Sequence, residues 1–265
     1  MVIYSSKGER LAEHSFLVLR LYHGMFGPRH ERLVANRLGV DLTFVSEAMR
    51  TACLLHDVGK ALKKFQEGVK EGKGFKFHEV VSALFTYNTL RNALSGADVL
   101  IKHCLSFAAA YAVLQHHQAM RDLQEVFSEG LKSLPLDGGI DDNVVNEIAM
   151  AAQMAVHLFD ASKVLEAFKE EVEKVPKEGL SVKLQELVSD FNEIMASGHP
   201  RGMPSSWAGR WAAAWAKLQS ALPLFVAPLQ LSDYLAAFIV RGGRYRRLHR
   251  EALLLLRRMP RQSPY

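Results

Sequence analysis

The chain has 265 residues, of which 49% are hydrophobic and 23% are charged, and its formal net charge at pH 7 is +5. This composition is ordinary for a globular protein, and the length suits one large domain or two small ones. No apolar run reaches the roughly 18 residues that span a bilayer, and no signal-peptide segment is visible, so we expect a cytoplasmic protein with no membrane contact. The two cysteines, Cys53 and Cys104, lie in apolar segments without CxxC spacing, which indicates buried thiols and excludes a cysteine zinc site.

Helical patterns dominate the sequence. Apolar residues recur every three to four positions in segments rich in Ala, Leu, Glu, Lys and Arg. In chain order, the predicted helices span residues 11–25, 43–56, 78–94, 101–120, 144–173, 181–196, 205–222, 229–241 and 245–258. Asp41 or Thr43 is the expected N-cap of the second helix, and Pro176, Pro223 and Pro228 are expected to end or separate helices.

Strand signals are weak, and no internal repeat or domain linker is visible. We therefore expect an all-α fold with one compact helical domain over residues 1–240. Residues 241–265 are expected to form a basic amphipathic C-terminal helix and tail packed on that domain. Eight arginines lie between residues 241 and 261, and this segment contacts nucleic acid or a partner, or else forms a solvated face.

Three tryptophans, Trp207, Trp211 and Trp215, recur every four residues and share one helical face. We favour a core stripe; a base-stacking platform for single strands is the alternative. Neither a GxxxxGK[ST] loop nor a GxGxxG motif occurs, which excludes a nucleotide-driven motor within the sequence.

Histidines offer the strongest chemical signal. Seven of the eleven lie in apolar helical surroundings: His14, His56, His78, His103, His116, His117 and His157. A single histidine of this kind is usually a hydrogen-bonded core residue, but His56 is followed by Asp57, and His116 is followed by His117. Adjacent helical residues point about 100° apart, so both members of a pair reach one site only at a helix end or beside two metals. Gly59 suggests such an end.

Five motifs occur in order along the chain. The segment LLHDVGK holds a His-Asp pair followed by a lysine, and the others are EHSFLV around His14, FHEVVSA around His78, LQHHQ with the paired histidines, and LSDYLAAF around Asp233. This set resembles the HD metal-dependent phosphohydrolase superfamily, and most of all its stand-alone CRISPR-associated HD nucleases. The resemblance extends from residue 11 to residue 238, which is nearly the whole chain.

The resemblance implies an HD-type helical domain with two divalent metal ions. One ion would be held by His14, His56, Asp57 and Asp233, and the other by Asp57, His78, His116 and His117, with Asp57 as the bridge. A ligand set rich in histidine favours transition metals such as Mn, Ni, Co or Fe, with Mg as the alternative. Two-metal sites hold their ions roughly 3.5–4 Å apart and activate water near neutral pH.

Two acidic residues compete for the last ligand position. We favour Asp233, while Asp160 in HLFDASK is the rival because His157 and Asp160 are three residues apart on one predicted helical face.

Lys60 is the second catalytic residue that the resemblance implies, beside Asp57. It would contact a phosphate oxygen as a point charge, and a solvated lysine is the alternative. For Ser82, packing or a hydrogen bond to the helix backbone explains the residue as well as a functional role does.

The resemblance implies hydrolysis of the phosphodiester bonds of single-stranded DNA in type I CRISPR interference. The sequence carries no helicase motif, so we expect a separate helicase subunit and an effector complex as partners. One alternative is an HD phosphohydrolase acting on free nucleotides or cyclic dinucleotides. The other is a helical interaction module whose histidines are structural.

Overall fold

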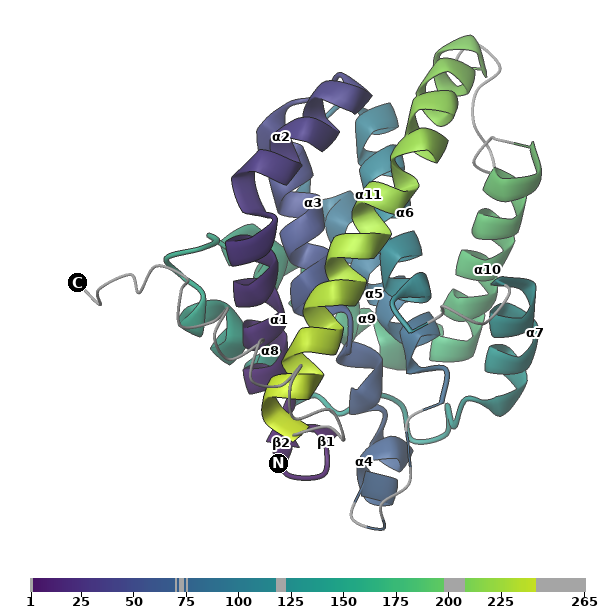
Figure 1. Cartoon of the computed structure of the whole chain (residues 1–265). Helices are drawn as coiled ribbons and strands as arrows, with labels where there is room; N and C mark the ends of the chain where they lie inside the picture. Colours follow the sequence, from purple (N-terminus) through teal and green to yellow (C-terminus); the bar gives the residue numbers. More distant parts are fainter. Residues whose placement is uncertain are drawn as a thin grey trace.

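Helices account for most of the chain in the computed structural model, which describes residues 2–69, 71, 74, 76–117, 123–197 and 208–241 (Figure 1). The helices are α1 (Leu11–Met25), α2 (Gly27–Leu38), α3 (Leu42–Leu55), the 3₁₀ helix η1 (Val58–Ala61), α4 (Lys63–Val69), α5 (His78–Ala93), α6 (Val99–Gln115), α7 (Leu123–Ser133), α8 (Val144–Met154), α9 (Ser162–Glu178), α10 (Leu180–Ser197) and α11 (Ala208–Arg241). Strands β1 (Tyr4–Ser6) and β2 (Glu9–Arg10) form one small antiparallel hairpin. The predicted all-α class is confirmed.

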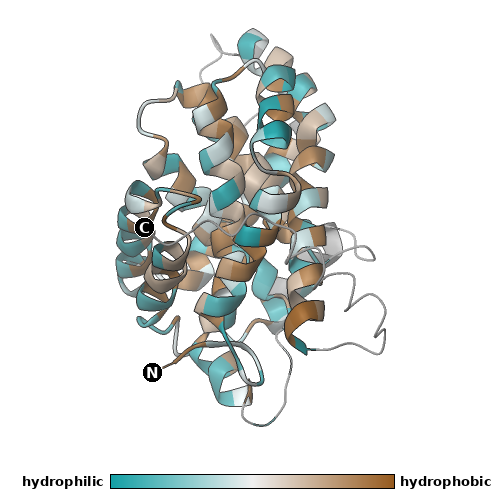
Figure 2. Ribbon diagram, turned by 60° about the vertical axis from the view of Figure 1, so that its left-hand side comes forward, coloured by the Kyte–Doolittle hydropathy of each residue, from teal (hydrophilic) through white to brown (hydrophobic). Residues whose placement is uncertain are grey.

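Helix α5 lies at the centre of the bundle. It packs against α3, α6, α9 and η1, and α11 crosses in front of it beside α1 and α6 (Figure 1). The sequence of α5 leaves little polar surface, and its first ten residues are all buried. Hydrophobic and hydrophilic residues alternate along the helices around it (Figure 2), as expected when one face of each helix packs on a core.

The predicted helix over residues 11–25 coincides with α1, and the predicted N-cap is confirmed because the Asp41 side chain accepts a hydrogen bond from the Thr43 N–H at 2.7 Å. The predicted helix over residues 144–173 is wrong. It is two helices, α8 and α9, separated by a turn. Asp160 lies in that turn and accepts from the Ser162 N–H at 3.1 Å. Pro176 does not end α9, which continues to Glu178.

Helix α11 corrects a second prediction, since residues 208–241 form one helix where two were expected. Pro228 removes the N–H that would bond to the Leu224 carbonyl four residues earlier. His30 of α2 replaces that donor, because its Nε2 bonds to the Leu224 oxygen at 2.7 Å. A side chain almost two hundred residues away in sequence thus satisfies the backbone group that the proline leaves free.

Because α11 is one continuous helix, the expectation that no segment is long enough to span a membrane has to be corrected. Among the described helices, Gly209–Arg241 is long and apolar enough to cross a bilayer by length and composition alone, so the prediction that no segment reaches that length is wrong. Helix α11 nevertheless packs against α1, α2 and α6 and buries the carboxylate of Asp233. These contacts are those of a helix in the core of the domain.

Trp211 and Trp215 belong to that core. They are 0% and 8% exposed, and the Trp215 ring meets Phe107 of α6 at a centroid distance of 5.5 Å. The preferred interpretation as a core stripe is confirmed for these two residues. Trp207 lies outside the described residues, as does the predicted C-terminal helix beyond Arg241, so the proposed domain boundary stays a prediction.

A buried ion pair, which does not involve α5, joins α1, α2 and α3. Glu31 of α2 is 1% exposed and receives the Arg50 guanidinium through Nε and Nη2, both at 2.8 Å. The Tyr22 and Ser46 hydroxyls also donate to Glu31. A buried carboxylate needs such complete pairing, so this group fixes α1, α2 and α3 to one another.

Gly59 allows the closest approach between two elements of the fold. A Cβ added at Gly59 of η1 would lie 2.1 Å from the backbone oxygen of His78. The Gly59 N–H donates to the Ser82 Oγ at 2.9 Å, which gives Ser82 a structural role at this contact. The absent side chain therefore lets η1 rest directly on the start of α5.

We expect Gly59→Ala to lower the free energy of unfolding by about 2–3 kcal/mol, because an extra methyl group in a filled core forces the backbone apart. Urea denaturation followed by circular dichroism measures the change. Gly209→Ala is the matched control, since no described atom lies within 4 Å of a Cβ added there. Unfolding midpoints that are equal for Gly59→Ala and the parent would contradict the close approach.

Candidate metal centre

The His56-Asp57 pair lies at a helix end, as the sequence predicts. Helix α3 ends at Leu55, His56 caps it, and Asp57 adopts φ −112° and ψ 5° before η1 begins. This break in the helix turns both side chains toward the same interior point. Both are 0% exposed.

His116 and His117 repeat this arrangement at the end of α6, where His116 is the C-cap. Each capping histidine bonds through Nδ1 to a carbonyl three residues earlier: His56 to Cys53 at 2.9 Å, and His116 to Val113. These bonds aim both Nε2 atoms into the interior. Neither Nε2 has a hydrogen-bond partner among the described residues.

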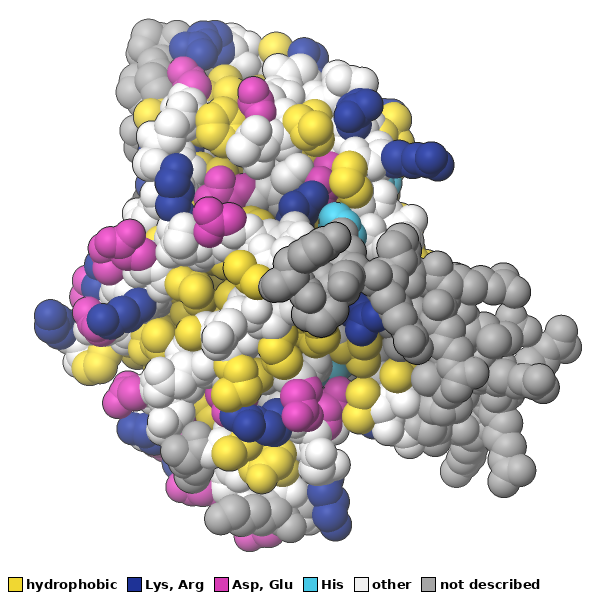
Figure 3. All heavy atoms as spheres, turned by 90° about the vertical axis from the view of Figure 1, so that its left-hand side faces the viewer, with side chains coloured by type: hydrophobic (Ala, Val, Ile, Leu, Met, Phe, Trp, Pro, Cys, Tyr) yellow, Lys and Arg dark blue, Asp and Glu magenta, His cyan; other side chains and the backbone are white. Residues whose placement is uncertain are grey.

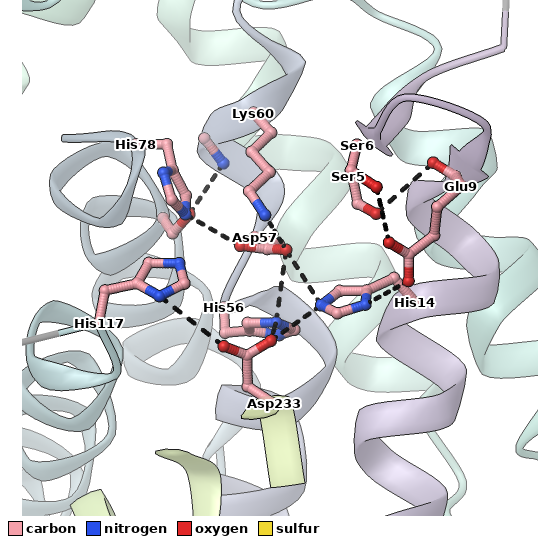
Figure 4. Close-up of polar contacts among 12 residues, drawn as sticks. Ser5, Ser6, Glu9, His14, His56, Asp57, Lys60, His78, His117 and Asp233 are labelled. Carbon is pink, nitrogen blue, oxygen red and sulfur yellow. Dashed lines mark hydrogen bonds and ion pairs between the residues drawn. The ribbon is translucent and has the colours of Figure 1, made fainter. Parts of the chain in front are cut away.

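The carboxylate of Asp57 lies at the centre of the cluster (Figure 4). Its Oδ2 is 3.3 Å from His14 Nε2 and 3.5 Å from His56 Nε2. Its Oδ1 is 3.0 Å from His78 Nε2 and 3.7 Å from His116 Nε2. The two oxygens of Asp57 thus face two different pairs of imidazoles, on α1 and α3 on one side and on α5 and α6 on the other.

Asp233 of α11 completes the cluster on the side of His14. Its Oδ1 is 3.0 Å from His14 Nε2 and 3.6 Å from His56 Nε2, and its Oδ2 is 3.8 Å from His117 Nδ1. The rival, Asp160, is exposed in the turn before α9, where it accepts from the Ser162 N–H. Of the two acidic candidates, the structure brings Asp233 to the histidines.

Lys60 also reaches the cluster. Its Nζ donates to Asp57 Oδ2 at 2.6 Å, and the side chain is 6% exposed, so it is not a solvated lysine. Lys60 therefore lies on the same side as Asp57, as expected for residues three positions apart in a helical turn.

The donor set fits divalent metal ions. Ligand atoms of Asp57, His78, His116 and His117 all lie within 4.8 Å of one another, and so do those of His14, His56 and Asp57. Imidazole nitrogens and carboxylate oxygens that converge from several elements are the ligands of transition metals. The two buried Nε2 atoms without partners are explained if each binds a cation, because buried polar atoms otherwise carry a desolvation cost.

Electrostatics around Asp57 and His14 favour positive charge, whereas burial lowers the pKa values of His56 and His117. Burial alone would raise the pKa of Asp57, but the Lys60 ammonium and the imidazoles outweigh it and hold that pKa well below its usual range. Burial would lower the pKa of His14, but hydrogen bonds to Asp233 and Glu9 raise it to about 9. The carboxylates that stabilise a proton on His14 stabilise a dication in the same place for the same reason.

His117 is the most exposed residue of the cluster. Its side chain is 35% exposed, whereas that of His78 is 4% exposed and that of Asp233 is 5% exposed. The His117 ring lies against His78 at a centroid distance of 5.0 Å. Among the residues of the cluster, His117 therefore lies nearest to the surface.

The structure adds one residue that the sequence did not suggest. Glu9 of β2 is 2% exposed and its Oε1 is 2.7 Å from His14 Nδ1. Burial would raise the pKa of Glu9, but the hydrogen bond and charge of His14 lower it to about 2. A two-residue strand carries no recognisable periodicity, so the sequence offered no signal beyond a glutamate five positions before a histidine.

The family model described as HD domain matches residues 32–137, a range that includes the His-Asp pair, His78 and the paired histidines. This part of the chain is therefore similar to the HD domain family. His14 and Asp233 lie outside the matched range, and the fold brings them to it.

Two curated relatives support the closer resemblance to CRISPR-associated HD nucleases. The chain is 28% identical over 119 residues to the CRISPR-associated endonuclease Cas3-HD of Pyrococcus furiosus, covering 42% of this chain and 47% of the relative. It is 32% identical over 125 residues to the protein of the same name from Methanocaldococcus jannaschii, covering 42% of this chain and 48% of the relative. The chain thus spans about half the length of the curated relatives it matches.

A solved structure shares the fold. The CRISPR-associated Cas3 HD domain protein from Methanocaldococcus jannaschii superposes with a TM-score of 0.51 at 21% identity, over 86% of this chain and 99% of the other. The HD-type helical fold expected from the sequence is therefore confirmed.

We expect Mn²⁺ or Ni²⁺ to stabilise the protein by about 2.7 kcal/mol at a concentration 100 times the dissociation constant. Differential scanning fluorimetry measures the corresponding rise in melting temperature. Asp57→Asn should abolish the rise, because the central carboxylate is lost. His157→Gln is the control, since His157 is exposed and outside the cluster. A parent protein that gains no stability from any divalent transition metal would show that the histidines are structural.

Proposed function

We propose that this protein is a metal-dependent nuclease that hydrolyses phosphodiester bonds of single-stranded DNA in the cytoplasm during type I CRISPR interference. The observation that carries the proposal is the convergence of five histidines and two aspartates on one buried point. Relatives that share the HD region are named CRISPR-associated endonucleases, which supports this class of reaction.

The ligand assignment follows from the two oxygens of Asp57. We assign one ion to the residues around Oδ2 and the second to those around Oδ1. The first set is His14, His56, Asp57 and Asp233, and the second is Asp57, His78, His116 and His117. Five imidazoles against two carboxylates favour Mn, Fe, Co or Ni over Mg, which prefers oxygen ligands.

Divalent ions bound at such a site lower the pKa of a coordinated water and neutralise charge on phosphoryl oxygens. The chain supplies the geometry for this chemistry. Carbonyl contacts to Nδ1 fix the rings of His56 and His116, and burial removes competing water from the donors. The Lys60 ammonium bonds to Asp57 Oδ2. When substrate is bound, it would exchange this bond for one to a phosphate oxygen of the substrate.

Surface charge does not by itself select the substrate. On the face in Figure 3, Lys and Arg side chains are interspersed with Asp and Glu. The preference for single-stranded DNA, the separate helicase subunit and the effector complex therefore remain parts of the proposal that rest on the resemblance to Cas3-HD proteins.

Purified protein should nick a labelled single-stranded DNA in the presence of Mn²⁺ and lose this activity in EDTA. His56→Ala and Asp57→Ala should each reduce the rate at least ~100-fold, because each removes a ligand of the metal ions that would activate water and stabilise the phosphate. His157→Ala should match the parent, since His157 lies outside the cluster. Variants of His56 and Asp57 that cut as well as the parent would refute the metal mechanism.

The same preparation distinguishes the rival phosphohydrolase. Deoxynucleoside triphosphates and cyclic dinucleotides are offered together with the DNA, and each product is quantified. If the small nucleotides are hydrolysed and the DNA stays intact, the nuclease proposal is wrong and the protein is a nucleotide phosphohydrolase.

Lys60→Met separates a catalytic lysine from a packing lysine. The thioether side chain preserves most of the buried volume, so we expect metal affinity equal to or higher than that of the parent and a cleavage rate about 100-fold lower. Isothermal titration with Mn²⁺ and the nicking assay give the two values. A normal cleavage rate with reduced stability would assign Lys60 to packing alone.

A further inference from the structure

The ring of His14 is held from both sides by carboxylates. Its Nε2 faces Asp233 at 3.0 Å and Asp57 at 3.3 Å, while its Nδ1 contacts Glu9 Oε1 at 2.7 Å (Figure 4). Both His14 and Glu9 lie out of solvent, at 0% and 2% exposure. Within the described part of the chain, the Glu9 carboxylate bonds to Ser6, His14 and Arg241 and to none of the other histidines of the cluster.

This arrangement differs from that of the capping histidines. The Nδ1 atoms of His56 and His116 bond to carbonyls of their own helices, which any helix end provides. His14 lies in the first turn of α1, whereas the carbonyls that a helix leaves free lie in its last turn. The ring is oriented instead by a side chain from outside the helix, that of Glu9.

Glu9 is in turn fixed by α11. Its Oε2 accepts from Arg241 Nε at 3.0 Å and Nη2 at 2.9 Å, and from the Ser6 hydroxyl at 2.9 Å. These donors satisfy the second oxygen of a carboxylate that burial would otherwise make costly. Arg241 follows Asp233 by eight residues on the same helix, so α11 contacts the His14 network at two points.

We propose that Glu9, clamped by Arg241, is a positioning residue that keeps the Nδ1 proton of His14 in place and directs Nε2 to the metal centre, raising its affinity for divalent cations. A carboxylate on the distal nitrogen of a ligating histidine fixes the tautomer and increases the basicity of the ligating nitrogen. The inference rests on the proposed metal site and adds the residues that tune it. It also gives a function to the hairpin, whose second strand carries Glu9.

Glu9→Gln tests the inference with little change in shape. The amide can donate to Nδ1 as well as accept from it, so the His14 proton is no longer confined to one nitrogen. We expect the dissociation constants for Mn²⁺ and Ni²⁺, measured by isothermal titration without nucleic acid, to rise 10- to 100-fold.

Glu31→Gln is the matched control. Glu31 is equally buried, at 1% exposure, and is also clamped by an arginine through Nε and Nη2, but it contacts no residue of the cluster. It should lower the melting temperature and leave the metal affinity within twofold of the parent. Equal losses of metal affinity in both variants would mean that general destabilisation explains the effect, and would overturn the inference.

Arg241→Gln tests the clamp. The Arg241 side chain is 44% exposed at the end of α11, so this variant is expected to fold, and metal affinity should fall by about threefold to tenfold. In the double variant with Glu9→Gln, the second change should add nothing, because Arg241 acts through Glu9. Independent, multiplicative losses would refute the clamp.

The outcomes also separate this inference from the proposed function. If the parent binds metal and Glu9→Gln binds equally well, the positioning role fails and the metal site stands. If the parent binds no divalent metal at all, both fail together.

Discussion

The buried carboxylate of Asp57 is the constraint on which the rest of the site depends. It is 0% exposed, and its two oxygens face imidazoles from α1, α3, α5 and α6 together with the Lys60 ammonium. An ionised carboxylate in such surroundings is stable only if positive charge lies on both of its sides. Every helix that supplies a donor must therefore end or pass at the same point, and the bundle is arranged to allow this.

Helix ends solve the problem of bringing neighbouring residues to one place. Consecutive helical side chains diverge, but at the ends of α3 and α6 the backbone turns and both members of each pair face inward. Gly59 completes this geometry because only a residue without a Cβ lets η1 approach the His78 carbonyl. The His-Asp pair, the glycine after it and the apolar flanks predicted the first of these ends. The second end was not predicted, because the helix expected over residues 101–120 runs past His116 and His117, whereas α6 ends at Gln115.

Features that depend on distant contacts were not predictable in the same way. The prolines of α11 favoured two helices. The helix continues past Pro228 because His30, in a different helix, donates to the Leu224 carbonyl that the proline leaves without an N–H partner. A turn separates α8 from α9, and Asp160 lies in it and accepts from the Ser162 N–H, although the sequence also allowed it a place on a helical face. Glu9 shows the same limit, since its partner Arg241 is separated from it by 232 positions. For Pro228 and Glu9, a side chain remote in sequence decides between local alternatives.

Helix α11 shows why continuity matters for the site. Asp233 contacts the inner nitrogen of His14, and Arg241 acts on the outer nitrogen through Glu9. Eight residues of α-helix separate these two positions by about 12 Å, and only an unbroken helix keeps that spacing fixed. A break at Pro228 would let the segment that carries both residues move relative to α1. The His30 contact to the Leu224 carbonyl prevents that break, so a hydrogen bond outside the metal centre helps to determine its geometry.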